Sequence, residues 1–229
     1  NLSIILFATG ITIYACEIFL ILSTKNFQQE VFTKKTKNFH DNRTKVEVLN
    51  DFKDAEIEAY PNIHPFYLLN DLSIRNGFLT KKGKIFPLGG ISNKIKVVAN
   101  ENGYWMIYKA DKYGFNNSNK TYEEDTIDIV ITGDSFAEGW AVNSEQNVSG
   151  LLKKLNFNVI NVGKGGNGPL IEYAKIKEYA EPLRPRIVLW FYYINDFDDL
   201  NREIKSEILL KYLYKKDFSQ KLIAAQNEI

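Results

Sequence analysis

The chain has 229 residues, of which 45% are hydrophobic and 25% charged, a composition typical of a globular protein with one main core. Its 29 basic residues nearly balance its 28 acidic residues, so the net charge of +1 supplies no field to attract nucleic acid, and we expect no DNA or RNA partner. The single cysteine, Cys16, excludes an internal disulfide framework. The two histidines, His40 and His64, have no second ligand at metal-binding spacing, so we expect no metal and no organic cofactor.

The first segment is almost entirely apolar from Leu2 to Leu22, with Glu17 as its one charge. About twenty residues in a helix are enough to cross the bilayer core, so the sequence predicts a transmembrane anchor over residues 1–23. A cleaved signal peptide, or a lipoprotein signal processed at Cys16, is a competing interpretation. Both are less favoured because the apolar run continues beyond Cys16 to Leu22.

The next two segments differ in composition. Residues 24–57 are polar and charge-rich and are predicted to form a linker or a solvated helix. In residues 58–125, proline and glycine separate short β-type runs such as 95–98 and 104–108, which predicts a small β-rich region. His64 precedes Pro65 and is therefore expected in a loop.

From about residue 126 to 229 the pattern alternates between strand and helix. Residues 127–131 read as a buried strand, and 144–155 contain a helix with one apolar face. Residues 157–162 form a second strand, and Gly168-Pro169 opens the next helix. Residues 186–192 are nearly continuously apolar, as central parallel strands tend to be. The order predicts a βαβαβ unit with a parallel sheet, hence an α/β fold.

The residues that follow these three strands are candidates for a functional site, because ligands of parallel sheets bind at the carboxyl ends of the strands. The three loops are residues 133–136, 163–168 and 193–196. Acyl transfer needs a nucleophile, for which Ser135 is the candidate, and donors for the oxyanion. The candidate donors are the backbone N–H of Ser135, a backbone N–H of the glycine loop at Gly166, and the side-chain amide of Asn195.

At these positions the chain resembles the SGNH/GDSL hydrolases. Residues 133–136, Gly-Asp-Ser-Phe, resemble the first block of the family; Gly166 resembles the second-block glycine, and Asn195-Asp196 the third block. The stretch from about Tyr60, including 87–92 and 113–117, resembles membrane-anchored bacterial members. The resemblance implies a three-layer α/β/α parallel sheet of flavodoxin-like type and a catalytic domain in the periplasm or outside the cell.

The location implied by the resemblance conflicts with the charges next to the apolar segment. Basic residues follow it at Lys25, Lys34, Lys35 and Lys37, and the positive-inside rule would place them in the cytoplasm. We give the resemblance precedence over this charge count.

Two features depart from the family pattern. Tyr193 and Ile194 occupy the place where members usually have a glycine before the third-block Asn. The general base of the family lies in a C-terminal Asp-x-x-His block, and no histidine follows His64 in this sequence. We expect a domain over 126–229 that is incomplete at its C-terminus. The alternatives are a base supplied by His64 or His40, and a pseudoenzyme that only binds its ligand.

Other interpretations of the same residues are less favoured. The 163–168 loop lacks the lysine and hydroxyl placement of a phosphate-binding P-loop. Asp198 and Asp199 could pass for a metal site, yet acidic pairs that open a helix usually stabilise its dipole. Asp134 is a candidate helix cap, and Glu138 and Trp140 either shape the acyl or sugar pocket or lie on the surface.

The sequence therefore predicts a serine ester hydrolase that works through an acyl-enzyme on Ser135. A carbohydrate ester or another small ester as substrate is what the resemblance implies. The alternatives are an O-acetyltransferase of exported polysaccharide, a non-catalytic glycan-binding protein, and a flavin-binding protein on the same general architecture.

Overall fold

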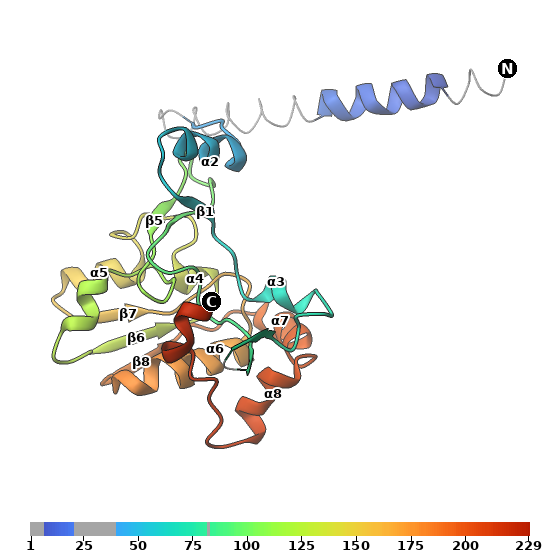
Figure 1. Cartoon of the computed structure of the whole chain (residues 1–229). Helices are drawn as coiled ribbons and strands as arrows, with labels where there is room; N and C mark the ends of the chain where they lie inside the picture. The colour runs from blue at the N-terminus through green and yellow to red at the C-terminus, as the bar shows by residue number, and fades with distance from the viewer. Residues whose placement is uncertain (1–6, 21–39, 82) are drawn as a thin grey trace. The chain divides into compact units, whose positions relative to one another are not determined.

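The computed structural model describes residues 7–20, 40–81 and 83–229 (Figure 1). The chain divides into two compact units, one of residues 1–44 and 100–105 and the other of residues 45–99 and 106–229. In the first unit, residues 7–20 are helical. Asp41 donates its backbone N–H to the carbonyl of Gly103 at 2.8 Å, and Trp105 Nε1 donates to the carbonyl of Arg43 at 3.0 Å.

Two predicted N-terminal segments lie partly outside the described residues. The anchor predicted over 1–23 is described only for 7–20, and none of the three described ranges contains a helix that is long and apolar enough to cross a membrane. The linker predicted over 24–57 is described from residue 40 onward. Part of it is the helix α2, Lys45–Asp54, whose Val48 is only 2% exposed.

After α2, the second unit contains short strands, as the composition of residues 58–125 predicts. Strands β1, β4 and β5 form one sheet, in which β4 pairs in parallel with β1 and antiparallel with β5. Strands β2 and β3 form an antiparallel pair. The elements of this region are β1 Ala59–Pro61, α3 Phe66–Leu69, β2 Phe78–Thr80, β3 Gly83–Ile85, β4 Ile95–Val97, β5 Ile107–Lys109 and the 3₁₀ turn η1 Asn119–Glu123.

The predicted alternation of strand and helix follows and is confirmed. Three parallel strands lie side by side in the order β7-β6-β8, with Ile129 of β6 opposite Val159 of β7 and Ile187 of β8 (Figure 1). The elements are β6 Ile129–Thr132, α4 Ser135–Glu138, α5 Val148–Lys154, β7 Val159–Asn161, α6 Pro169–Lys175, η2 Ile176–Ala180, η3 Glu181–Leu183 and β8 Ile187–Trp190. The chain continues with α7 Asp196–Glu203, α8 Glu207–Tyr214, α9 Leu222–Ala225 and η4 Gln226–Glu228. The protein is thus a mixed α/β fold with small sheets.

Successive side chains of a strand point to opposite faces of the sheet. Residues of α5 pack on one face of the parallel sheet and residues of α6 on the other. Ile129 and Ile131 pack with residues of α5, including Val148 and Leu152. Val130 lies in the larger cluster with Leu170, Ile171 and Ala174 of α6. The same larger cluster contains Leu69 of α3 and the loop residues Phe86 and Phe115, so the β-rich region and the α/β region share one core.

Helix α5 is shorter than its apolar pattern predicts. It starts at Val148 because the Asn147 side chain accepts the backbone N–H of Gly150 at 2.8 Å and caps the helix. Only part of the expected apolar face is covered: Val148 and Leu152 pack on the core, whereas Leu151 is 51% and Leu155 67% exposed.

Strand β8 occupies an edge position, which differs from the predicted central one. Strand β6 is the middle strand, and within the described part of the chain nothing pairs with the outer edge of β8. Its side chains are correspondingly accessible: Ile187 is 50%, Val188 40% and Trp190 44% exposed. An apolar run of this length indicates a strand but does not distinguish an edge from a central position.

Helix α6 is capped by a carboxylate from another helix. Its N-cap residue, Gly168, has no side chain to accept the free N–H groups of the first turn. Glu203, at the end of α7, accepts the N–H of Gly168 at 2.6 Å and that of Leu170 at 2.9 Å. Burial raises the pKa of Glu203 to about 7 against the opposing effect of these bonds.

We expect Glu203→Ala to lower the free energy of unfolding by about 1–3 kcal/mol, because it leaves two buried N–H groups without an acceptor. Urea unfolding followed by circular dichroism measures the loss. Asn201→Ala, at an exposed position of the same helix, should change stability by less than about 0.5 kcal/mol. Equal effects of the two substitutions would contradict the capping role.

The raised pKa of Glu203 also predicts a pH dependence. Between pH 4.5, the ordinary value, and about 7, the folded state holds a proton on Glu203 that the unfolded state has released. The stability contributed by the protonated form is complete below pH 4.5 and is lost as the pH rises through 7, by at most about 3 kcal/mol. We therefore expect wild type to lose stability relative to Glu203→Gln between pH 4.5 and 7.5; parallel stability curves over this range would refute the assignment.

Candidate functional site

Ser135 begins the short helix α4, directly beyond the carboxyl end of the middle strand β6. The turn between them requires glycine at 133, where φ is +149° and a Cβ would lie 2.8 Å from the Cβ atoms of Ala137 and Phe191. The interpretation of Asp134 as a helix cap is confirmed, since its side chain accepts the N–H of Phe136 at 2.9 Å. The sequence Gly-Asp-Ser thus turns the chain sharply and places Ser135 on the first helical position.

The Ser135 side chain is partly exposed and its hydroxyl makes no hydrogen bond to any residue that the structure describes. Its backbone N–H likewise has no acceptor among them. The carbonyl of Ser135 accepts the N–H groups of Gly139 and Trp140, both at 3.1 Å, which closes α4. The oxygen that would attack and one N–H that would stabilise an oxyanion are therefore both unengaged.

The glycine loop after β7 lies against the turn that precedes Ser135. Lys164 donates its backbone N–H to the carbonyl of Gly133 at 3.2 Å. Gly166 has φ +68°, and a Cβ there would lie 2.4 Å from the ring of Phe66. Glycine is thus required at 166 by the backbone conformation and by the aromatic ring. The N–H of Gly166 has no acceptor in the described part of the chain.

Asn195 lies at the N-terminus of α7, in the loop after β8. Its Nδ2 donates to Asp199 Oδ2 at 3.3 Å, which leaves one of the two amide hydrogens unused. The first and third loops are adjacent, since the rings of Phe136 and Tyr193 have centroids 5.0 Å apart. No hydrogen bond among the described residues joins Ser135, Gly166 and Asn195 to one another.

A buried polar network lies next to these loops, with the carboxylate of Glu138 at its centre. Glu138 is 1% exposed. Its Oε1 accepts from Asn62 Nδ2 at 2.6 Å, and its Oε2 accepts from the backbone N–H of Gly165 at 2.7 Å. Lys164 Nζ lies 3.5 Å from Oε1 and is also bonded to Asn62 Oδ1 at 2.8 Å and the Tyr108 hydroxyl at 3.0 Å. The alternative that Glu138 lies on the surface is wrong.

The charges of this network hold Glu138 ionised. Burial by itself would raise the pKa of Glu138, but the Lys164 ammonium and the hydrogen bonds from His64 and Gly165 hold that pKa far below its usual range. Burial lowers the pKa of Lys164, and the charge of Glu138 opposes this. The two charges compensate each other in a site closed to water, so removal of either leaves the other buried and unpaired.

His64 lies in the loop between β1 and α3, as expected, and belongs to this buried network. It is 2% exposed, its Nε2 lies 2.9 Å from Asn62 Nδ2 and 3.3 Å from Glu138 Oε2, and its ring packs 5.0 Å from the ring of Trp140. No contact between His64 and Ser135 is present in the described ranges. His40, the other candidate base, lies in the first compact unit and hydrogen-bonds Asn42 at 3.1 Å.

The acidic pair after β8, Asp198 and Asp199, lies in the first turn of α7. Asp199 is ion-paired with Arg202, while Asp198 is exposed in the first turn of α7. Within residues 7–20, 40–81 and 83–229, no group of three or more His, Cys, Asp or Glu side chains is placed to hold a metal ion.

Sequence reasoning missed the burial of Asn62, Lys164 and Asn167. The first two are more than 100 residues apart, and no local pattern indicates that they meet. Asn167 is fully buried between Gly166 and Gly168, and neither its Nδ2 nor its Oδ1 has a partner among the described residues. The only local signal was an amide side chain inside a glycine-rich loop.

Comparison with known proteins adds no relative: no protein-family model, curated protein or solved structure matches this chain.

We expect the Glu138–Lys164 pair to behave as a unit in a double-mutant cycle. Glu138→Leu and Lys164→Met should each lower the free energy of unfolding by about 3–5 kcal/mol, because each leaves one buried charge uncompensated. The double variant should lose less than the sum by at least about 1 kcal/mol. Denaturant unfolding measures all three, with Lys154→Met at an exposed position as the control. Strict additivity would show that the two charges do not compensate each other.

Proposed function

We propose that the chain is a serine ester hydrolase that acts through an acyl-enzyme on Ser135. In the first step Ser135 Oγ bonds to the ester carbonyl carbon, its proton passes to a base, and the alcohol leaves with a proton. In the second step water attacks the acyl-enzyme, which releases the acid and restores the serine. We assign the protein to the SGNH/GDSL type, with a three-layer α/β/α organisation of its hydrolase domain.

The observation that carries this proposal is the position of Ser135. Its hydroxyl is free of hydrogen bonds to the described residues, and it lies at the carboxyl end of the middle strand of a parallel sheet, where ligands of such sheets bind. A serine at a tight turn whose only role is structural would be expected to use its hydroxyl to cap or bridge backbone groups, and in this turn Asp134 has the capping role.

The candidate oxyanion donors support the same chemistry. The backbone N–H groups of Ser135 and Gly166 have no acceptor in the described chain, and one amide hydrogen of Asn195 is unused. Removal of one such donor typically slows acyl transfer about 10²- to 10³-fold. The described contacts bring no histidine to Ser135, because His64 contacts Asn62 and Glu138 and His40 contacts Asn42. The proposed mechanism therefore requires a base that these contacts do not place beside Ser135.

A carbohydrate ester is the proposed substrate class, on the strength of the sequence resemblance. The same acyl-enzyme would make the protein an O-acetyltransferase if a sugar hydroxyl replaced water in the second step. Product analysis with and without an acceptor glycan distinguishes the two. A non-catalytic glycan-binding protein would form no acyl-enzyme.

The test is covalent labelling of Ser135 in the protein as expressed from its own gene. We expect a fluorophosphonate probe to modify Ser135, detected by peptide mass spectrometry, and p-nitrophenyl acetate to be hydrolysed. Ser135→Ala should abolish labelling and lower the hydrolysis rate by at least about 10³-fold. Ser73→Ala, at an exposed serine, should change neither. Equal rates for wild type and Ser135→Ala, with no labelling, would refute the hydrolase proposal and favour a non-catalytic binding protein.

We further propose that the apolar segment from Leu2 to Leu22 anchors the protein and that the hydrolase domain faces the periplasm or the exterior. Protease treatment of intact inverted and right-side-out vesicles tests this orientation. We expect cleavage of the domain only when its proposed side is outermost; protection there, with cleavage from the cytoplasmic side, would refute it.

A further inference from the structure

A small apolar pocket in the second unit has a buried lysine in its lining. Its volume is about 260 Å³, which is room for roughly nine water-sized groups at ~30 Å³ each. Its apolar side chains include Leu68, Phe78, Pro87, Ile91 and Ile229. Its polar side chains are those of Asn62, His64 and Lys96. A pocket of this size and lining suits a small ligand with an apolar body and few polar groups.

Lys96 is the polar side chain of this pocket that has no acceptor. Asn62 and His64 contact each other and Glu138, so they belong to the buried network described above. Lys96 is 1% exposed, and its ammonium forms neither an ion pair nor a hydrogen bond with any residue of the described ranges. Its Nζ lies 5.5 Å from the centroid of the Tyr60 ring, a contact that leaves the charge without an anion.

The charges around Lys96 add to the need for an anion. Burial and the like charge of Lys164 lower the pKa of Lys96 to about 8. Lys164 has the carboxylate of Glu138 at 3.5 Å, whereas no carboxylate of the described residues is paired with Lys96. At pH 7 the Lys96 amine is still mainly protonated. The folded protein therefore holds a desolvated cation, whose burial costs free energy until an anion binds.

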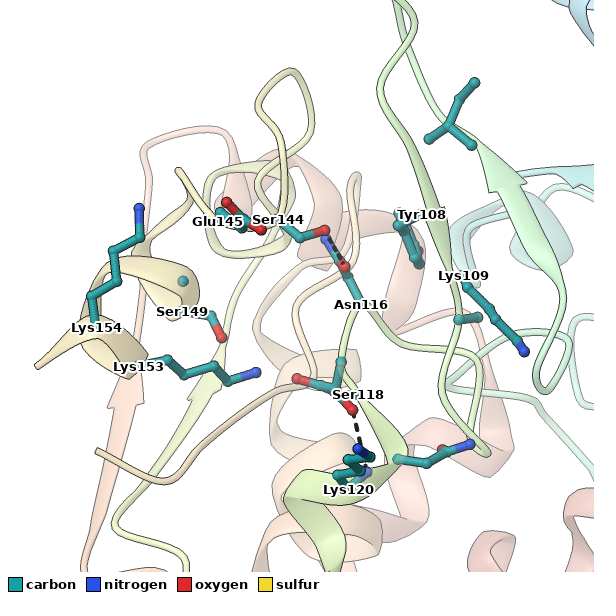
Figure 2. Close-up of a pocket in the computed structure, with 15 residues that line it drawn as sticks. Tyr108, Lys109, Asn116, Ser118, Lys120, Ser144, Glu145, Ser149, Lys153 and Lys154 are labelled. Carbon is teal, nitrogen blue, oxygen red and sulfur yellow. Dashed lines mark hydrogen bonds between the residues drawn. The ribbon is translucent and has the colours of Figure 1, made fainter. Parts of the chain in front are cut away.

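The lysines of a larger hollow show the contrast. Figure 2 shows this hollow, of about 870 Å³, between the segment from β5 to η1 and the segment that contains α5. Lys109, Lys120 and Lys154 in its lining are exposed, so water already solvates their charges. Lys96 has no such access to water, and its charge requires a partner more strongly.

The pocket around Lys96 offers a second donor. Gly89 is a buried lining residue, and its backbone N–H has no acceptor in the described part of the chain. One ammonium and one N–H group correspond to the two oxygens of a single carboxylate. A phosphate or a polyanion would bring more negative charge than one lysine compensates in an apolar pocket.

We propose that this pocket binds a small aliphatic monocarboxylate, with the carboxylate paired with Lys96 and the chain against the apolar wall that includes Leu68, Phe78 and Ile91. The apolar lining accounts for the chain, the unpaired ammonium for the single charge, and the volume for the length. The proposal goes beyond ester hydrolysis, since Ser135, Gly166 and Asn195 are not among the lining residues.

Calorimetric titration of the full chain with heptanoate at pH 7 tests the proposal. We expect saturable binding of one heptanoate per chain. Heptanamide has a similar shape and no charge, and it should bind at least about tenfold more weakly because it forms no ion pair. Pentanoate lacks two methylene groups and should bind about 15-fold more weakly. The Ser135→Ala variant should bind heptanoate as wild type does, so failure of the hydrolase proposal and failure of this one remain distinguishable.

Variants locate the binding. Lys96→Met removes the ammonium and should weaken heptanoate binding at least about tenfold. Lys109→Met, at an exposed position of the neighbouring strand β5 and outside this pocket, should leave the affinity unchanged. Without ligand, Lys96→Met should melt at a higher temperature than wild type, because an apolar side chain replaces an unpaired buried charge. Heptanoate should raise the melting temperature of wild type and not that of Lys96→Met.

Four outcomes would overturn the proposal. The first is the absence of saturable heptanoate binding, and the second is equal affinity for heptanoate and heptanamide. The third is unchanged heptanoate affinity in Lys96→Met, which would place the ligand elsewhere. The fourth is a lower melting temperature of unliganded Lys96→Met than of wild type, which would give the lysine a structural role.

Discussion

The arrangement of the candidate site depends on one buried carboxylate, Glu138, three residues after Ser135. An ionised carboxylate closed to water is tolerated only when it is paired and hydrogen-bonded. Asn62, Lys164 and the backbone N–H of Gly165 supply those partners. The helix that begins with Ser135 and the glycine loop after β7 therefore cannot separate without breaking several bonds to a charge that has no access to water.

A second carboxylate fixes the other end of the same loop. Glu203 accepts the N–H groups of Gly168 and Leu170, whereas Glu138 accepts that of Gly165. Gly166 and Asn167 lie between these two attachment points. A backbone N–H stabilises an oxyanion effectively only when it is oriented before the reaction, because reorientation at the moment of charge development costs free energy. Attachment from both α4 and α7 provides that orientation for the unengaged N–H of Gly166.

The periodic part of the fold was predictable from the sequence, and the buried network was not. Apolar runs and 3.6-residue apolar patterns are local, so they predicted β6, β7 and β8 to within a few residues of their observed bounds and the start of α6 at Pro169, whereas α5 is shorter than predicted. Glu138 meets Asn62 across 76 residues of sequence, and Lys164 meets Asn62 across 102. A lysine in a glycine-rich loop and a glutamate in a short helix are usually solvated, and only tertiary contacts determine that both Lys164 and Glu138 are buried. The edge position of β8 was equally beyond local patterns, because strand order is set by pairing and not by apolarity.

For the proposed acyl transfer, the described residues supply more candidate oxyanion donors than candidate bases. Two free backbone N–H groups and an amide hydrogen lie on the three loops, and each such donor is worth about 10²–10³ in rate when aimed at the oxyanion. A general base typically contributes about 10²–10⁴, and a serine hydroxyl without one is a weak nucleophile at neutral pH. His64, the one histidine of this unit, is already committed to Glu138 and Asn62. Its recruitment by Ser135 would remove a hydrogen bond from the carboxylate that holds the glycine loop, so nucleophile activation and oxyanion stabilisation would compete if both relied on His64.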